Sequence, residues 1–133
     1  IMDFKDFSKR FADKIGGEYQ EYDDNHSIFV IPLKDDRFQT VIARLVDHEK
    51  YNRKTVQVTS KVCSVDHPID YPAVLEASKD FVHTNFIVED GYLKVDTSIF
   101  LDHTDENLIE EMITEVAYTA DEWEFKITGQ DVF

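Results

Sequence analysis

The sequence predicts an α+β fold in which an antiparallel sheet carries its helices mainly on one face. Three observations predict it. Amphipathic patterns with helical spacing occur near the start, in the middle and toward the end of the chain. Runs of alternating or continuous apolar residues lie between them. Short turn-like segments separate these runs, which favours antiparallel neighbours over parallel crossovers. The expected order is α-β-β-β-β-α-β-β-α within a single domain of residues 1–133.

Residues 3–15 are predicted to form the first helix. Their large apolar side chains recur at spacings of three and four, as on one face of a helix: Phe4, Phe7, Phe11 and Ile15. Gly16 follows this stripe, and glycine readily takes the left-handed conformation that ends a helix. We expect the aromatic stripe to pack into the core, and a docking ridge for a partner is the alternative.

Four strands are predicted next, over residues 18–22, 27–33, 38–46 and 55–65. The second and third of these are apolar at nearly every position, which is typical of strands covered on both faces. The fourth alternates between valine and polar residues, so it should have one wet face. One layer of helices covers only one face of a sheet. We therefore expect another helix or a second chain over part of the other face.

A second helix is predicted from Pro72 to about His83, because proline suits the first turn of a helix. The third helix is expected to begin after Thr104 as its N-cap and to run from Asp105 through Ala120 toward Gly129. Its apolar residues recur at the spacing of a helix that packs along a sheet. The residues after this helix are expected to be loosely held.

Asp90 and Gly91 are predicted to close a hairpin through a type I′ turn, which favours positive φ at both positions. This turn pairs apolar side chains on one face: Val88 with Leu93, and Phe86 with Val95. An acidic metal or catalytic site at Glu89 and Asp90 is the alternative. The turn explains these acids without a metal.

The charge balance restricts the class of partner. The chain has 14 basic and 28 acidic residues, a net charge of −14. A phosphate backbone or an anionic membrane surface would be repelled, so we expect neither nucleic acid nor membrane as a partner. A basic protein segment is compatible with the charge, and solubility alone is the alternative explanation. The first residues include acids and no apolar signal-peptide core, which favours a cytoplasmic protein.

The residues that could support chemistry form no recognisable motif. Cys63 is the only cysteine and lies in a strand-like stretch, so we expect a packed structural thiol. The histidines lack the spacing of a helical zinc site, and no Gly-rich phosphate loop or nucleophile elbow is present. The segment 102–105 most resembles a ligand cluster, but a loop and helix cap explain it. We therefore expect no catalytic residue, metal or cofactor.

The segment Phe86-Ile-Val-Glu-Asp-Gly-Tyr-Leu-Lys-Val, the helix from Asp105 to Ala120 and the element order together resemble the type III secretion chaperone-like fold. Within that fold, the chain is most similar to the YbjN-like family of bacterial sensory transduction regulators. The resemblance implies a non-enzymatic, acidic, cytoplasmic homodimer. Such a protein holds an extended segment of a protein or peptide partner on apolar patches.

Two sets of residues follow as candidates. The partner-binding set is Phe4, Phe7, Phe11, Tyr19, Phe29 and Ile31. The resemblance points to the second helix and the hairpin for dimer contacts, which gives Phe81, Ile87 and Tyr92. A small-ligand-binding or enzymatic domain, with a pocket between sheet and helices, is the alternative function. A structural subunit of a larger assembly is a third.

Overall fold

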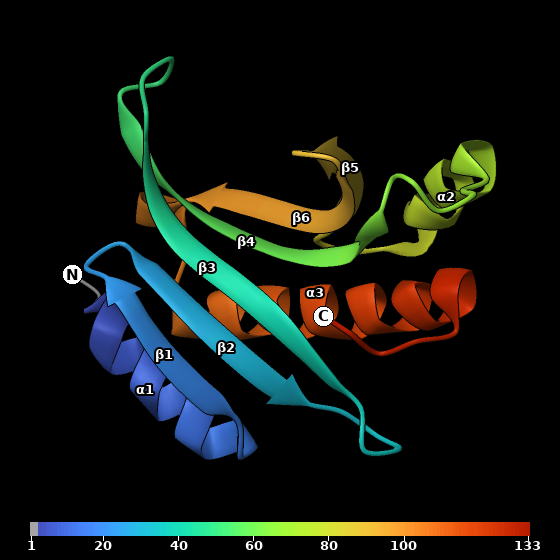
Figure 1. Ribbon diagram of the computed structural model, residues 1–133. Helices are drawn as coiled ribbons and strands as arrows, with labels where there is room; N and C mark the ends of the chain where they lie inside the picture. Colours follow the sequence, from blue (N-terminus) through green and yellow to red (C-terminus); the bar gives the residue numbers. More distant parts are fainter. Residues whose placement is uncertain (1–2) are drawn as a thin grey trace.

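The computed structural model describes residues 3–133 (Figure 1). Its elements follow the order α-β-β-β-β-α-β-β-α, which confirms the predicted fold class. The helices are α1 (Phe4–Ile15), α2 (Tyr71–Ala77) and α3 (Glu106–Thr128). The strands are β1 (Glu18–Asp23), β2 (His26–Pro32), β3 (Phe38–His48), β4 (Arg53–Ser64), β5 (Asn85–Glu89) and β6 (Tyr92–Phe100). Two short 3₁₀ turns are η1 (Ser78–Asp80) and η2 (Leu101–His103).

The strands form one six-stranded antiparallel sheet in the order β1-β2-β3-β4-β6-β5. Strands β3 and β4 lie at its centre, while β1 and β5 form its two edges. Because side chains alternate between the faces of a strand, each strand contributes to both faces. Figure 1 shows β2 and β3 passing in front of α3, and the face turned away from the viewer there is the inner face.

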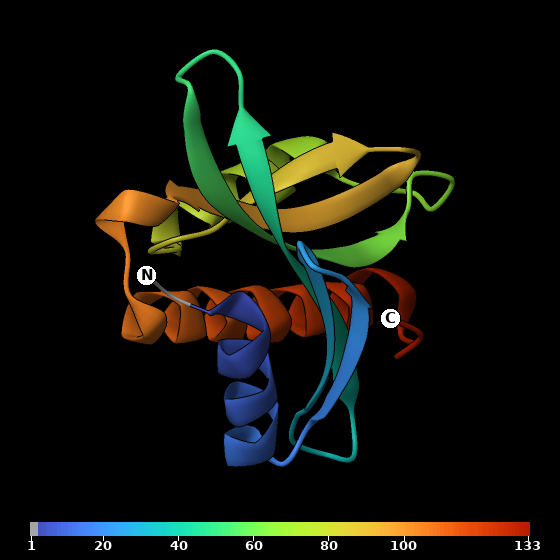
Figure 2. The same ribbon diagram turned by 90° about the vertical axis from the view of Figure 1, so that its left-hand side faces the viewer.

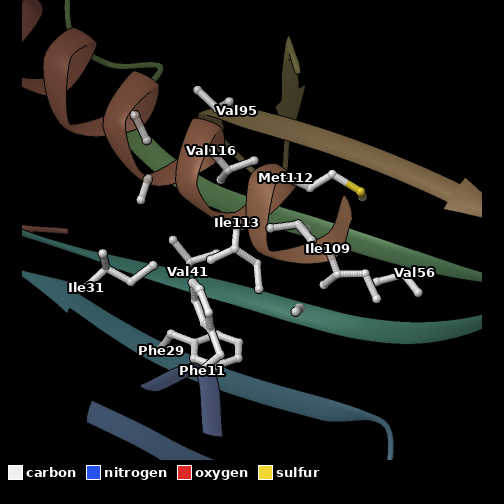
Figure 3. Packing of buried hydrophobic residues seen from close by; sticks show 14 of the residues in the cluster. Phe11, Phe29, Ile31, Val41, Val56, Val95, Ile109, Met112, Ile113 and Val116 are labelled. Carbon is white, nitrogen blue, oxygen red and sulfur yellow. The ribbon is translucent and has the colours of Figure 1, made fainter. Parts of the chain in front are cut away.

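Helices α1 and α3 pack on this inner face. Helix α3 contacts β3, β4 and β6, whereas α1 contacts β1 and β2 and runs across the direction of α3 (Figure 2). Figure 3 shows the core between these helices and the sheet, where Ile113 of α3 lies close to Val41 of β3. Two ion pairs join the helices, with Arg10 2.7 Å from Glu106 and Lys14 3.2 Å from Glu110.

The ends of α1 confirm the prediction from its sequence. The Asp3 carboxylate accepts hydrogen bonds of 3.1 Å from the backbone N–H groups of Lys5 and Asp6, which satisfies N–H groups that have no partner within the helix. Gly16 ends the helix in the left-handed conformation, with a φ of 68°.

Two predicted helix boundaries are wrong. The N-cap of α3 is Asp105 and not Thr104, because the Asp105 carboxylate accepts a 2.9 Å hydrogen bond from the backbone N–H of Leu108. Helix α2 ends at Ala77 and continues only as η1, well short of His83. Glu115 of α3 accepts hydrogen bonds from the backbone N–H groups that a longer α2 would have used.

The β5–β6 hairpin has the predicted turn and register. Asp90 has a φ of 53° and Gly91 a φ of 80°, as a type I′ turn requires. The apolar pairs are those predicted, Val88 with Leu93 and Phe86 with Val95. The turn therefore accounts for the acidic residues at this position.

Candidate protein-binding face of the sheet

The outer face of the sheet, opposite α1 and α3, exposes apolar side chains. Ile28 and Val30 of β2 and Ile42 of β3 point to this face and are only partly buried. Ile28 lies opposite Ile42 across the β2–β3 ladder, so the three form one patch, here called the outer patch. The helices that contact the strands of this patch, α1 and α3, lie on the inner face. Neither of these helices therefore covers Ile28, Val30 or Ile42.

The residues after α3 return to the sheet and lie against β3. The backbone N–H of Phe38 donates a 3.1 Å hydrogen bond to the Asp131 carboxylate, and that of Thr40 donates one of 2.5 Å to the carbonyl of Phe133. The backbone N–H groups of Val132 and Phe133 donate to the Glu124 carboxylate at 2.7 and 3.1 Å. The expectation that these residues are loosely held is therefore wrong, because a buried carboxylate on α3 binds their backbone.

This tail, residues 131–133, occupies a gap between two central strands. The β3–β4 ladder runs from Ile42 opposite Thr59 to His48 opposite Arg53, next to the turn that joins the strands. Before Ile42 in β3 and after Thr59 in β4, the two strands are no longer paired. There the Gln39 amide spans the gap by donating a 2.7 Å hydrogen bond to the Ser60 hydroxyl. This gap beside Phe38–Thr40 is here called the β3–β4 split.

A hollow of about 230 Å³ opens on the outer face where the tail meets the sheet. Its lining residues are Thr40, Ile42, Thr59, Ser60, Lys61, Lys94, Val132 and Phe133. The hollow therefore combines aliphatic and aromatic walls with two ammonium groups. The Lys94 ammonium lies 2.9 Å from the Glu89 carboxylate, and this hydrogen bond lowers the pKa of Glu89. Because Ile42 belongs to both, the hollow continues the outer patch.

The neighbouring part of the outer face is a closed polar network. The Arg44 guanidinium donates to the side-chain amide oxygen of Gln57 at 2.5 Å, and the side-chain amide nitrogen of Gln57 donates to the Asp96 carboxylate at 2.8 Å. Burial raises the pKa of the Asp96 carboxyl, although the hydrogen bond from Gln57 opposes the shift. Because these groups satisfy one another, this part of the outer face is polar, in contrast to the outer patch and its hollow.

The predicted partner-binding residues are gathered together, but inside the molecule. Phe4, Phe7, Phe11, Phe29 and Ile31 have at most 5% of their surface exposed. Tyr19 is partly exposed, and its ring centre lies 6.0 Å from that of Phe29. The set packs between α1 and the inner face, where Figure 3 shows Phe11, Phe29 and Ile31, so a partner could reach these side chains only if α1 moved. The set therefore does not form an open surface, because α1 uses its aromatic stripe to cover the sheet.

The predicted dimer residues do not share one surface. Phe81 packs beside Phe86 on the inner side, with ring centres 5.4 Å apart. Ile87 and Tyr92 point to the outer face, since Ile87 lies opposite Lys94. The apolar side chains that are most exposed in this region are Leu75, Val82 and Val88.

Other candidate sites have structural explanations. Cys63 is buried, and burial raises the pKa of its thiol, which disfavours the reactive thiolate. In the segment 102–105, Asp102 pairs with Arg53 at 2.6 Å and Asp105 caps α3. Within residues 3–133, no three His, Cys, Asp or Glu side chains are arranged to hold a metal ion.

A second hollow bears on the alternative function, a domain with a ligand pocket between sheet and helices. The hollow, of about 840 Å³, lies on the outward side of α3 between α1 and the segment around His83. It does not lie between helices and sheet, where the alternative function would place a ligand pocket.

No helix within residues 3–133 is both long and apolar enough to span a bilayer.

Comparisons with known proteins agree with the fold. No protein-family model and no curated protein matches the sequence. Among solved structures, a chain in the crystal structure of the ExsC-ExsE complex is similar, with a TM-score of 0.55 and 12% sequence identity. The match covers 95% of this chain and 97% of that one. It confirms the type III secretion chaperone-like fold, while membership of the YbjN-like family stays a prediction.

Proposed function

We propose that this chain is a non-enzymatic, chaperone-like domain that holds an extended segment of a protein partner on the outer face of its sheet. The observation that carries the proposal is the outer patch, since Ile28, Val30 and Ile42 are apolar side chains that neither α1 nor α3 covers. Contiguous apolar patches, when large and exposed, mark interaction sites on soluble proteins, and the hollow beside Ile42 enlarges this one. The similar solved structure is itself one of a complex.

The edge of the sheet next to the patch supplies a second type of contact. Strand β1 lies at this edge and is mostly exposed, so its outer backbone groups are available for pairing. A partner segment that added to β1 would gain backbone hydrogen bonds, and its outer-face side chains would lie beside Glu18 and Gln20, the β1 neighbours of Val30 and Ile28. The net charge of −14 favours a segment with basic flanks.

Peptide selection tests this proposal. Peptides are selected from a random phage-displayed library on the immobilised chain, and their affinities are then measured for variants. Ile28→Lys should weaken binding about tenfold or more, which corresponds to at least about 1.4 kcal/mol. Thr114→Lys adds the same charge at an exposed position of α3 and should leave affinity unchanged. A library without specific binders, or equal affinity in both variants, would overturn the proposal.

The homodimer is the second part of this proposal. The free edge of β5 and the exposed side chains of Leu75, Val82 and Val88 support a contact between two copies. Sedimentation equilibrium of the wild type should give a dimer at micromolar concentration. Val88→Lys should give monomers, because a lysine on an edge strand opposes pairing. A monomeric wild type would remove the homodimer from the proposal.

A further inference from the structure

The tail lies in the β3–β4 split as an added strand would. The β3–β4 backbone ladder does not extend to Thr40, where the Ser60 hydroxyl of β4 donates to the Thr40 carbonyl instead. The carbonyl of Phe133 accepts the hydrogen bond that the Thr40 N–H donates. Two residues earlier along β3, the Phe38 N–H donates a hydrogen bond to the Asp131 carboxylate. The split therefore offers two backbone N–H groups of β3 to an extended segment, and they bind one side-chain oxygen and one backbone carbonyl of the tail, neither of them from residue 132.

The side chains of the tail show which residues the split accepts. The Phe133 ring meets the Tyr92 ring edge-on, with centres 5.9 Å apart, and Lys61 lies 5.6 Å from its centre. Val132 lines the hollow but remains 60% exposed. An aromatic residue thus finds a specific contact, and the aliphatic residue before it has room for a larger side chain.

The tail fits the split imperfectly at its acidic residue. Asp131 adds a carboxylate close enough to Glu124 to raise the pKa of the Glu124 carboxyl, although burial of Glu124 is the larger cause. One carboxylate oxygen of each residue, and the side-chain oxygen of Gln39, are buried without a hydrogen-bond partner among the described residues. Unpaired buried acceptors are costly, so a segment that brought a donor in place of the carboxylate would fit better.

We propose that the β3–β4 split is a docking site for an extended partner segment, and that residues 131–133 are its internal competitor. The segment has an uncharged hydrogen-bonding residue, such as asparagine, followed by two apolar residues of which the second is aromatic. Asparagine keeps an acceptor for the Phe38 N–H, replaces the unpaired carboxylate oxygen by an N–H donor and removes a negative charge that acts on Glu124. This inference rests on the proposed function, since it names the kind of partner segment that the outer face takes.

Nuclear magnetic resonance of the full chain tests the inference. The probe is the peptide Thr-Gly-Gln-Asn-Val-Phe, titrated into the wild type and into the double variant Asp131→Ala/Phe133→Ala, whose tail has lost both of its side-chain anchors. The backbone amides of Phe38, Thr40 and Thr59 should shift in the double variant. The wild type should bind about tenfold more weakly, because its own tail competes at high effective concentration.

Peptide controls separate the chemistry of the segment from adventitious binding. Thr-Gly-Gln-Asp-Val-Phe, which copies the chain, should bind the double variant more weakly than the asparagine peptide. Thr-Gly-Gln-Asn-Ala-Ala should shift none of the three amides. If the double variant fails to fold, the single variant Phe133→Ala repeats the titration with only one side chain changed.

Two results would overturn the inference. One is that the amides beside the split do not shift in the variant, and the other is that the wild type binds as tightly as the variant. Neither result touches the outer patch at Ile28, which lies outside the lining of the hollow. Selected peptides that need Ile28 but shift no amide of the split would leave the proposed function standing.

Discussion

The Glu115 carboxylate on α3 accepts a hydrogen bond of 2.8 Å from the backbone N–H of Thr84. It also accepts bonds of 3.1 and 2.7 Å from the N–H groups of Val82 and His83. One side chain thus holds the whole link between η1 and β5 against α3. Because Thr84 is buried, water cannot easily replace Glu115 as the acceptor for its N–H.

Glu115→Ala should lower the free energy of unfolding by about 1–3 kcal/mol, since it leaves the Thr84 N–H without its acceptor. Urea unfolding at neutral pH measures the loss. Glu111→Ala, one turn earlier on the same helix, is the matched control, because its side chain is 66% exposed and only approaches His83 at 3.4 Å. Equal stability of the two variants would contradict a structural role for Glu115.

The effect of Glu115 should also depend on pH. Burial by itself raises the pKa of Glu115, but hydrogen bonds from Thr84, His83 and Val82 outweigh it, and the net shift is downward from 4.5. A carboxyl with a lowered pKa stabilises the folded state above its unfolded pKa and loses this effect as pH falls through the folded value. The difference between wild type and Glu115→Ala should therefore be full above about pH 4.5 and shrink in acid.

Phe11→Ala tests whether the aromatic stripe of α1 belongs to the core. Phe11 is 4% exposed and meets Phe29 edge-on, with ring centres 5.8 Å apart. Loss of a buried ring of this size should cost about 3–5 kcal/mol. Val82→Ala changes a side chain that is 80% exposed and should have little effect. Unchanged stability of Phe11→Ala in urea would show that the stripe is free to bind a partner instead.

Gly91→Val should destabilise the β5–β6 hairpin by about 1–3 kcal/mol, because a β-branched residue disfavours a φ of 80°. A side chain at this position would meet no atom within 4 Å, so the cost is due to the backbone alone. Glu49→Val, in the β3–β4 turn, is the control at a residue without a positive φ. A thermal unfolding midpoint that is the same in both variants would be inconsistent with the type I′ turn.

Glu124→Gln should change how stability depends on pH. Burial raises the pKa of the Glu124 carboxyl above 4.5, although hydrogen bonds from Val132 and Phe133 oppose the shift. A raised carboxyl pKa means that the charged form costs the folded state free energy, so stability falls as pH rises from the unfolded to the folded value. Stability of the variant relative to wild type should rise across that window and then level off. Parallel curves from pH 4 to pH 8 in urea unfolding would disprove the assignment.

The local elements follow from local chemistry. Helix α1 ends where Gly16 offers a left-handed conformation, and the β5–β6 register follows from the turn at Asp90 and Gly91 together with alternating apolar residues. The end of α2 could not be predicted from the local sequence. It depends on Glu115, a residue of another helix that binds the backbone beyond Ala77. Contacts between distant segments override local preference at such places.

The candidate site was predicted only in part. The apolar pattern of β2 and β3 indicated that both faces needed cover, and the outer patch is where that cover is incomplete. The predicted partner-binding residues of β2 lie on the inner face: Phe29 and Ile31 are buried there, whereas Ile28 and Val30 point to the outer face. In a strand that is apolar on both sides, the sequence pattern does not distinguish the two faces.

The sequence by itself determined the order of the elements, the hairpin and its register, because turn geometry and side-chain periodicity act over a few neighbouring residues. The tertiary structure alone decided which face of β2 and β3 stays open and that the tail lies in the β3–β4 split. Both depend on where α1 and α3 dock and on the buried Glu124, whose bonds reach Val132 and Phe133 only after α3 has packed against the sheet.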